Sequence, residues 1–418
     1  MTRCVVVGSG AREHALAHAL AQSAEVTVTP GNDGIAAHGL TCVATAATEL
    51  DADLFVIGPE APLVEGLADR LRKQGKTVVG PGEAGAQLEG SKSFMKEFLT
   101  VAGVPTAGYG IFSDEAAATG FLETMTPPYV IKTDGLAAGK GVLVTSDLDE
   151  AKNDIADKLS GKSFGVAGRT IVLEEGLVGE ECSLHVLCDG TDVVALASAQ
   201  DYKRVGDQDT GANTGGMGSY APMSTLSDSQ VDDVMRTIIT PTLKELSLRS
   251  IDFRGVLYAG LMLTASGPKL LEYNVRFGDP ETEVLAPLYG ERLYDLLART
   301  GAGQLAGASA SAVGASVSVV LASEGYPQAP RTGDVIEGLG ADGQLATPMD
   351  KVIVFHAGTK RDDQGRFVTN GGRVLAVTGR GDTLTEARER AYSAAGLITV
   401  PGSIRRSDIA LTASQGES

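Results

Sequence analysis

The chain has 418 residues, of which 43% are hydrophobic, and its formal net charge is −18. This length predicts roughly two to four domains, and the hydrophobic content is enough for their cores and excludes a disordered or fibrous protein. A strongly acidic chain repels nucleic acid and anionic membranes, so we expect neither as its main partner.

The first hundred residues predict a parallel sheet covered by helices. Residues 3–8 are an apolar run that ends in glycine, and residues 13–20 have helical spacing. A strand over 54–58, a helix over 63–71 and a strand over 77–80 repeat this order. Successive strand and helix units are typical of parallel sheets, so we expect residues 1–102 to form an α/β domain.

The turn after the first strand, Gly8-Ser-Gly-Ala-Arg-Glu13, opens a helix, so its amides are suited to an anion. Glu13 replaces the third glycine of the dinucleotide fingerprint and would crowd the helix against the strand. A single phosphate group therefore fits better than NAD. A second tight turn, Pro30-Gly-Asn32, points to the same sheet edge. Taken alone, either turn is more often structural than functional.

We expect a second domain over residues 103–300, with a small antiparallel lobe at about 124–190. A helix over 92–101 ends at Gly103, and Val104-Pro105 begins a new segment. Residues 129–144 have the pattern of a strand, a glycine-rich turn and a second strand. Further strands are expected over 170–174, 183–187, 193–197, 256–263 and 270–275, and a helix over 228–246.

The strand and turn after Tyr129 carry the features of a triphosphate site. Glycines 135, 139 and 141 let the backbone approach phosphates, and Lys132 and Lys140 neutralise their charge. The spacing from Gly135 to Lys140 matches a P-loop, but Gly141 occupies the Ser/Thr position and the loop joins two strands. A P-loop is therefore poorly supported.

Residues 269–281 are the most informative segment of the chain. Glu272, Asn274 and Arg276 alternate along an apolar strand and therefore share one face. Oxygen ligands beside a guanidinium are typical of a magnesium–nucleotide site. The alternative is an edge strand with a solvated polar face.

Two polar segments add candidates. Residues 174–181 follow a strand and could form a hinge that meets adenine and ribose, although alone they are a surface charge run. Residues 201–218 are a polar, glycine-dense stretch, and loops of this length are usually functional.

A third domain is expected over residues 301–418. Strands are predicted over 316–321, 351–355 and 373–377, and an amphipathic helix over 384–398, with frayed residues from about 412.

His14 and His18 have the spacing of metal ligands, but no acid follows His14 and no cysteine is near, which argues against zinc. The remaining histidines form no visible triad of a hydrolase.

The cysteines and apolar runs favour a cytoplasmic protein. Cysteines 4, 42, 182 and 188 form no Cys-x-x-Cys pair, as expected in a reducing compartment. No apolar run reaches the roughly 18 residues of a membrane helix, and the N-terminus has no signal-peptide pattern.

The sequence resembles the phosphoribosylamine–glycine ligase (glycinamide ribonucleotide synthetase) family of ATP-grasp enzymes in many segments, which occur in the same order as in that family. These segments are residues 8–14, 58–63, 88–92, 134–141, 203–207, 213–218, 276–281 and 355–359. The resemblance implies an ATP-grasp fold in an α/β multidomain chain, with a Rossmann-like N-terminal domain and a C-terminal mixed sheet. It also implies that ATP, glycine and 5-phosphoribosylamine become glycinamide ribonucleotide, ADP and phosphate through glycyl phosphate, the second step of purine biosynthesis.

The same resemblance implies roles for individual residues. Arg276, Lys132 and Lys140 would be catalytic, and Glu272 and Asn274 would bind Mg²⁺ or Mn²⁺. ATP would contact Lys92, Lys132, Gly135, Gly139, Lys140, Gly141, Glu174, Glu175, Leu177 and Glu181. The two acceptor substrates would contact Gly8, Gly10, Arg12, Glu13, Gly31, Asn32, Asp201, Lys203, Arg204, Asn213, Thr214, Gly215, Gly216, Asp279 and Glu281. A monomer and a transient contact with the upstream amidotransferase are further expectations.

Two other functions stay open on the residues. A related ATP-grasp enzyme could carboxylate aminoimidazole ribonucleotide or transfer formate, although residues 58–63 and 213–218 favour the glycine ligase. A catalytically silent nucleotide sensor would keep the lysines and the loop, but the joint presence of Glu272, Asn274 and Arg276 argues against it.

Overall fold

The structure is a computed structural model that describes residues 2–136, 141–161, 169–223 and 225–416. Within these ranges no helix has both the length and the hydrophobicity needed to cross a bilayer.

The N-terminal sheet is parallel, as predicted, with the strand order β3-β2-β1-β4-β5. Its strands are Arg3–Gly8 (β1), Glu25–Pro30 (β2), Thr41–Cys42 (β3), Leu54–Ile57 (β4) and Val78–Val79 (β5). Helices follow at Ala11–Leu20 (α1), Asp33–Ala37 (α2), Glu60–Val64 (α3), Leu67–Lys73 (α4), Glu83–Gly90 (α5) and Lys92–Ala102 (α6), with a 3₁₀ turn at Ala47–Glu49 (η1). The single helix predicted over 63–71 is wrong, because Gly66 adopts left-handed backbone angles and separates α3 from α4.

Two later helices also cover this sheet. Helices α11 (Thr282–Tyr289) and α12 (Arg292–Ala302) share a buried apolar cluster with α1 and with strands β1, β2 and β4. Gly301 permits the close approach of α12 to β5, since a Cβ there would lie 3.1 Å from the Val78 carbonyl oxygen. The chain therefore returns to the N-terminal sheet with residues 282–302.

A small antiparallel lobe is present, but it includes residues 109–122, before the predicted start at about 124, and residues 180–189 belong to another sheet. Its sheet has the order β6-β9-β7-β8, formed by Tyr109–Phe112, Ile171–Glu175, Tyr129–Thr133 and Val142–Thr145. Helices α7 (Glu115–Leu122) and α8 (Leu148–Leu159) close its separate apolar core.

The central sheet has the order β11-β10-β16-β17, formed by Val193–Ala195, Glu180–Asp189, Arg254–Thr264 and Gly267–Asn274. The predicted helix over 228–246 is a helical segment in three parts: α9 (Asp228–Val234), a π-helical stretch η4 (Met235–Ile239) and α10 (Thr240–Leu248). β17 carries an irregularity at Leu271, because Gly260 pairs with Glu272 while Leu261 pairs with Leu270.

The C-terminal sheet has the order β12-β15-β18-β22-β19, formed by Gln200–Asp201, Gly218–Ala221, Ala315–Ala322, Arg373–Gly381 and Val352–His356. The predicted stripe of α13 (Leu384–Ala395) packs on it, although the helix ends at Ala395 rather than 398. A ribbon of β20 (Thr359–Arg361) and β21 (Phe367–Thr369) lies beside it. The frayed terminus predicted from 412 is wrong, since Leu411–Gln415 form α14, and Thr385 Oγ1 bonds to the Ser414 carbonyl oxygen at 2.9 Å.

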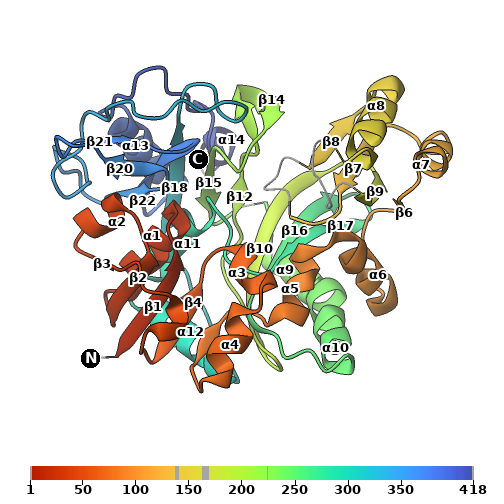
Figure 1. Cartoon of the computed structure of the whole chain (residues 1–418), viewed down its shortest axis with the longest axis horizontal. Helices are drawn as coiled ribbons and strands as arrows, with labels where there is room; N and C mark the ends of the chain where they lie inside the picture. Colours follow the sequence, from red (N-terminus) through yellow and green to blue (C-terminus); the bar gives the residue numbers. More distant parts are fainter. Residues whose placement is uncertain (1, 137–140, 162–168, 224, 417–418) are drawn as a thin grey trace.

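The polar stretch over 201–218 is not a simple loop. It contains β12, a hairpin of β13 (Arg204–Gly206) and β14 (Thr210–Asn213) joined by the turn η3 (Asp207–Asp209), and then β15. Because β12 and β15 pair into the C-terminal sheet, this stretch links the central and C-terminal sheets. Figure 1 shows β14 beside the blue C-terminal elements and the small lobe at the other end of the molecule.

Candidate active site

A pocket between the small lobe and the central sheet brings together six of the residues predicted for ATP, metal and catalysis. Predicted residues that line it are Lys92, Gly135, Gly141, Glu272, Asn274 and Arg276. Glu60 and Glu89 line it as well. The pocket therefore brings together segments as far apart in the sequence as Glu60 and Arg276.

The predicted alternation of β17 is confirmed at its C-terminal end. Glu272 and Asn274 line the pocket, while the Val275 side chain is fully buried in the core behind them. Leu271, at the irregularity, is only partly buried and does not belong to that core. β17 is the edge strand of its sheet, but its polar face lines a pocket and is not a freely solvated surface.

Glu272 is surrounded by cations. Burial alone would raise the pKa of its carboxyl group, but Lys203, Lys132, Lys92 and Arg276 outweigh burial and lower that pKa. The carboxylate is therefore ionised at neutral pH and available to a cation. The side-chain oxygen of Asn274 accepts a hydrogen bond from Arg276 Nη2 at 3.2 Å.

Arg276 is held between two acids that the sequence analysis did not assign. Its Nη2 lies 2.8 Å from Glu89 Oε1, and its Nε lies 3.3 Å from Glu60 Oε2. Both acids belong to segments 58–63 and 88–92, which carried the family resemblance without a stated role. Because these acids come from the N-terminal domain, that domain sets the position of Arg276.

Lys132 belongs to a buried ion-pair network on the small-lobe side. Its Nζ lies 3.0 Å from Glu174 Oε1, and Lys96 Nζ lies 2.9 Å from Glu174 Oε2. Lys96, which the sequence analysis missed, has a fully buried side chain that also donates to Thr106 Oγ1 at 2.8 Å. The Glu174 carboxylate is thus shared by two lysines.

The start and end of the glycine-rich turn are fixed, and its centre lies outside the described residues. Lys92 Nζ donates to the Gly135 carbonyl oxygen at 3.0 Å, and Thr133 N donates to the Gly141 carbonyl oxygen at 2.8 Å. Gly139 and Lys140, predicted for ATP, are among residues 137–140 and are therefore not described.

The segment after β9 connects the two lobes. Glu175 accepts hydrogen bonds from the Gly108 amide at 3.0 Å and from Lys269 Nζ at 3.3 Å. Leu177 is partly buried, and Glu181 lies on β10 with its Oε2 2.8 Å from Lys203 Nζ. These contacts agree with a hinge between the small lobe and the central sheet.

An acidic cluster surrounds Lys203. Burial raises the pKa of Asp201, with Glu281 and Glu181 acting in the same direction and Lys203 against it. Glu281 is buried and accepts hydrogen bonds from Ser183 Oγ at 3.2 Å and from the Tyr258 hydroxyl. The predicted residues Asp201, Lys203 and Glu281 therefore lie in one electrostatic environment with Glu272.

The N-terminal turn is filled by its own glutamate. Glu13 is buried, and its Oε2 accepts the Gly10 amide at 2.6 Å, while its Oε1 lies 2.6 Å from Arg12 Nε. A Cβ at Gly8 would collide with this carboxyl group, which explains the glycine there. An external anion at this turn would need donors other than the Gly10 amide.

Asn32, in the second turn, connects the N-terminal and C-terminal domains. Its side-chain nitrogen donates to the carbonyl oxygens of Ser9 at 2.8 Å and His356 at 3.1 Å. Its side-chain oxygen caps α2 by accepting the Ile35 amide at 2.9 Å, and Gly31 before it has a positive φ of 69°.

A further residue that the sequence analysis missed, Arg373 of β22, joins two groups of candidates. Its Nη1 lies 2.9 Å from Asp279 Oδ1 and donates to the Gly215 carbonyl oxygen at 2.5 Å. Next to Gly215, Thr214 Oγ1 accepts the Gly216 amide at 3.0 Å. At the hairpin, Arg204 pairs in register with Asn213.

Four histidines, His14, His18, His38 and His356, form a cluster where the N-terminal and C-terminal domains meet. His14 Nε2 lies 2.8 Å from His38 Nδ1, and the His356 amide donates to His14 Nδ1 at 2.9 Å. His18 stacks on His38 with ring centroids 5.0 Å apart. Among the described residues no group of three or more His, Cys, Asp or Glu side chains could hold a metal ion.

Comparison with known proteins decides the family. Models of phosphoribosylglycinamide synthetase match the chain with the N domain at residues 2–89, the ATP-grasp (A) domain at 90–282 and the C domain at 316–412. The chain belongs to the phosphoribosylglycinamide synthetase family. The resemblance inferred from the sequence is thereby confirmed.

Individual relatives agree with this family over nearly the whole chain. A phosphoribosylamine–glycine ligase from Caulobacter vibrioides is 46% identical, and the alignment covers 98% of each chain. The crystal structure of a phosphoribosylamine–glycine ligase from Thermotoga maritima is 35% identical, with a TM-score of 0.86 over 97% of this chain and 100% of that chain.

A more distant structure supports the ATP-grasp fold. The biotin carboxylase domain of the Hydrogenobacter thermophilus 2-oxoglutarate carboxylase, solved with MgADP, ADP and bicarbonate, has a TM-score of 0.72 at 18% identity. The match covers 97% of this chain and 92% of that chain. At this identity the likeness concerns the fold alone.

Proposed function

We propose that this member of the phosphoribosylglycinamide synthetase family joins glycine to 5-phosphoribosylamine with ATP, giving glycinamide ribonucleotide, ADP and phosphate. The observation that carries the proposal is the convergence of Glu272, Asn274, Arg276 and Lys92 on one pocket. The relatives aligned over nearly the full length are named for this ligation. It is a step of purine biosynthesis.

The nucleotide lies between the lobes in this proposal. Lys92 and Lys132 neutralise the phosphates, together with the turn that contains Gly135, Gly139, Lys140 and Gly141. Adenine meets the backbone of the segment with Glu174, Glu175 and Leu177, and Glu181 binds ribose. Lys132 then exchanges its contact with Glu174 for one with a phosphate, and Lys96 continues to balance the Glu174 charge.

The chemistry needs no nucleophilic side chain. A glycine carboxylate oxygen attacks the γ-phosphorus, ADP leaves, and glycyl phosphate forms. The amine of phosphoribosylamine then attacks the carbonyl carbon, loses a proton and displaces inorganic phosphate. Both steps depend on charge neutralisation and on fixed positions. The positive charge of Arg276 neutralises the transferring phosphoryl group, and the two acids that contact Arg276 fix its position.

The residues present fit a divalent cation. The ionised Glu272 carboxylate and the Asn274 amide oxygen are ligands of the type that Mg²⁺ and Mn²⁺ accept, with phosphate oxygens completing the shell. Such an ion supplies further charge neutralisation at the phosphates. The neighbouring strand β16 (Arg254–Thr264) has no acidic residue. Of these two strands, β17 therefore supplies both protein ligands, Glu272 and Asn274.

The acceptor substrates occupy the side of the site formed by the N-terminal turns and the segment 201–216. Arg12, Glu13 and the turns with Gly8, Gly10, Gly31 and Asn32 are assigned to the sugar phosphate. Residues around glycine and the amine are Asp201, Lys203, Arg204, Asn213, Thr214, Gly215, Gly216, Asp279 and Glu281.

Free, mostly buried thiols agree with a reaction in the cytoplasm. We propose a monomer that contacts the upstream amidotransferase transiently.

The test is release of ADP from ATP with Mg²⁺, leaving out in turn glycine and phosphoribosylamine generated from ribose 5-phosphate and ammonia. The proposal requires that ADP release depends on both acceptors. Release that depends instead on bicarbonate or formate would overturn the substrate assignment. Absence of release under every condition, with ATP still bound, would identify a silent nucleotide-binding protein.

A further inference from the structure

The hairpin β13–β14 has acceptor-site candidates at its base, next to the start of β13 and at the end of β14. Lys203 precedes it, and Asn213 closes it beside Thr214. The base of the hairpin is fastened because the Thr214 amide and the Thr214 hydroxyl both donate to the Lys203 carbonyl oxygen at 2.8 Å. A shift of the hairpin would therefore move the backbone of Lys203.

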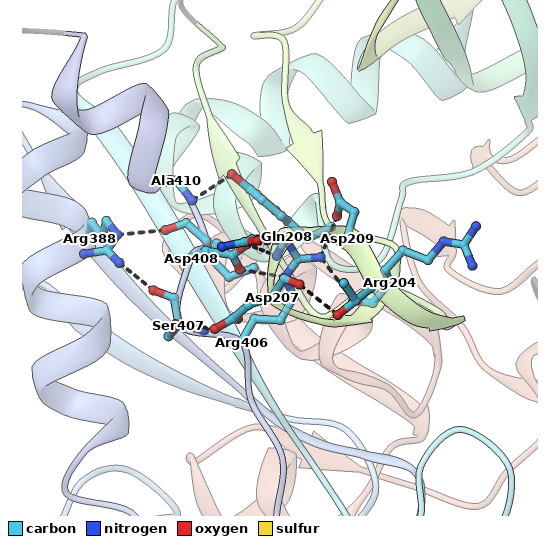
Figure 2. A network of polar contacts seen from close by, with 12 residues as sticks. Arg204, Asp207, Gln208, Asp209, Arg388, Arg406, Ser407, Asp408 and Ala410 are labelled. Carbon is cyan, nitrogen blue, oxygen red and sulfur yellow. Dashed lines mark hydrogen bonds and ion pairs between the residues drawn. The ribbon is translucent and has the colours of Figure 1, made fainter. Parts of the chain in front are cut away.

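Arg406, near the C-terminus, contacts this hairpin both in its turn and at the first residue of β13 (Figure 2). Its Nη1 lies 2.7 Å from Asp209 Oδ1 and donates to the Arg204 carbonyl oxygen at 3.2 Å. Its Nε and Nη2 form a two-point contact with both carboxylate oxygens of Asp408 at 2.7 Å. The Arg406 side chain is only 1% exposed, so this cation is buried against the hairpin.

The residues after Arg406 hold the tip of the hairpin through one backbone amide and one side chain. Asp408 Oδ2 accepts the Gln208 amide at 2.8 Å, and Asp207 Oδ1 accepts the Ser407 amide at 2.8 Å. Gln208 and Asp209 have positive φ angles of 56° and 53°. Residues other than glycine rarely adopt such angles unless their surroundings enforce them, and the contacts with residues 406–408 are in place to do so.

The C-terminal segment is itself fixed to the C-terminal domain. Arg388 of α13 donates to the carbonyl oxygens of Ser407 at 2.6 Å and Ile409 at 2.9 Å, as Figure 2 shows. The Tyr392 hydroxyl donates to the Arg406 carbonyl oxygen at 3.0 Å. The segment is therefore a rigid support for the hairpin.

Lys203 connects the hairpin to the residues proposed to bind the acceptor substrates. The Lys203 ammonium lies 2.8 Å from Glu181 and interacts with Asp201 and Glu272, so it connects the proposed acceptor, ribose and metal residues. The Tyr202 ring, one residue before Lys203, lies under the Arg406 guanidinium at 4.7 Å, and its hydroxyl accepts the Ala410 amide at 2.9 Å. Arg406 thus holds the chain on both sides of Lys203.

We propose that Arg406 is a positioning residue for the acceptor substrates: it anchors the β13–β14 hairpin to the C-terminal domain and so fixes Lys203 and residues 213–216. It does not touch the substrates. This inference rests on the proposed function for the identity of the acceptors.

The test compares Arg406→Met with the matched control Arg405→Met in the full-length protein. The Arg405 side chain donates to the Ala395 carbonyl oxygen of α13, and among the described residues it forms no hydrogen bond or ion pair with the hairpin. Arg406→Met is expected to raise the KM for an acceptor, glycine or phosphoribosylamine, about tenfold or more, while the Kd of an ATP analogue changes less than about twofold. Amide exchange in residues 204–213 should become faster in this variant, and Arg405→Met should leave both readouts unchanged.

A second variant keeps the test decisive if Arg406→Met does not fold. Asp209 has a side chain that is 69% exposed, so Asp209→Asn removes the negative charge that pairs with Arg406 without opening the core. It should raise the acceptor KM about three- to fivefold and speed exchange in the hairpin. Asp233→Asn, which removes an exposed pair with Arg236 elsewhere, is its control.

The outcomes separate the two proposals. Unchanged acceptor KM and unchanged exchange in folded Arg406→Met or in Asp209→Asn would overturn the positioning role, as would an equal loss of nucleotide affinity. If the unaltered protein makes no glycinamide ribonucleotide, the proposed function fails instead. In that case amide exchange in residues 204–213 tests only whether Arg406 anchors the hairpin. Unchanged exchange in the variants would overturn that anchoring role.

Discussion

The guanidinium of Arg276 and the carboxylate of Glu89 lie 2.8 Å apart although 187 positions separate them in the chain. The second oxygen of the same carboxylate accepts the Val275 amide at 2.9 Å. Glu89 therefore fixes both the side chain of Arg276 and the backbone just before it. A residue of the N-terminal domain positions the cation that we assign to phosphoryl transfer.

Glu89→Gln should lower kcat while changing ATP affinity little. Glutamine can still accept the Val275 amide but loses the charge that holds Arg276, so a fall in kcat of about tenfold is expected. Steady-state kinetics and equilibrium binding of an ATP analogue measure the two effects. The exposed Glu97 on α6 supplies the control Glu97→Gln, and equal kinetics of the two variants would contradict the role of Glu89.

Arg276→Ala should lower turnover far more than nucleotide affinity, because the proposed contact strengthens in the transition state. A loss in kcat of about a hundredfold to a thousandfold is expected, with the Kd of an ATP analogue within about threefold. An unchanged kcat at saturation, with weaker nucleotide binding, would remove Arg276 from the catalytic residues.

The Lys96–Glu174 pair should contribute to folding stability. Lys96→Met leaves Glu174 buried with only Lys132 as a charged partner, so the free energy of unfolding should fall by about 3 kcal/mol. Urea unfolding followed by circular dichroism measures the change, with the exposed Lys73→Met as control. A loss below about 1 kcal/mol would show that the pair adds no more than a surface contact.

The histidine cluster predicts lower stability in acid. Burial, with a smaller effect of His38, lowers the pKa of His18 to about 4 from 6.5. Between pH 6.5 and 4 the unfolded chain binds a proton that the folded chain excludes, so the free energy of unfolding falls as the pH falls through this range. For His18 alone the effect is at most about 3 kcal/mol.

His18→Phe, which keeps a ring for stacking on His38, isolates this contribution. The variant should lose less stability than the parent protein between pH 6.5 and 4, and the two should be similar at pH 7.5. Parallel stability curves over the whole range would contradict the assignment.

The residues along β17 could be predicted because alternation is local. A strand places every second side chain on one face, so the positions of Glu272 and Asn274 follow from their spacing. The irregularity at Leu271 was missed, since it depends on how β16 pairs with β17 rather than on either sequence alone.

The residues that hold the predicted ones could not be found in this way. Glu60, Glu89, Lys96 and Arg373 contact partners in distant segments of the chain, and sequence spacing carries no information on such distances. β12 and β15 are short strands whose structure is decided by pairing with the C-terminal sheet. Their own polar and glycine-rich sequences gave no strand pattern.

The most direct measurement follows oxygen from glycine. Protein, ATP, Mg²⁺, phosphoribosylamine and glycine labelled with ¹⁸O in its carboxylate are incubated, and the phosphate and the ribonucleotide product are analysed by mass spectrometry. The account predicts glycinamide ribonucleotide together with phosphate that carries one ¹⁸O atom, because a glycine oxygen leaves with the phosphoryl group. Unlabelled phosphate, or ADP formation without glycinamide ribonucleotide, would contradict it.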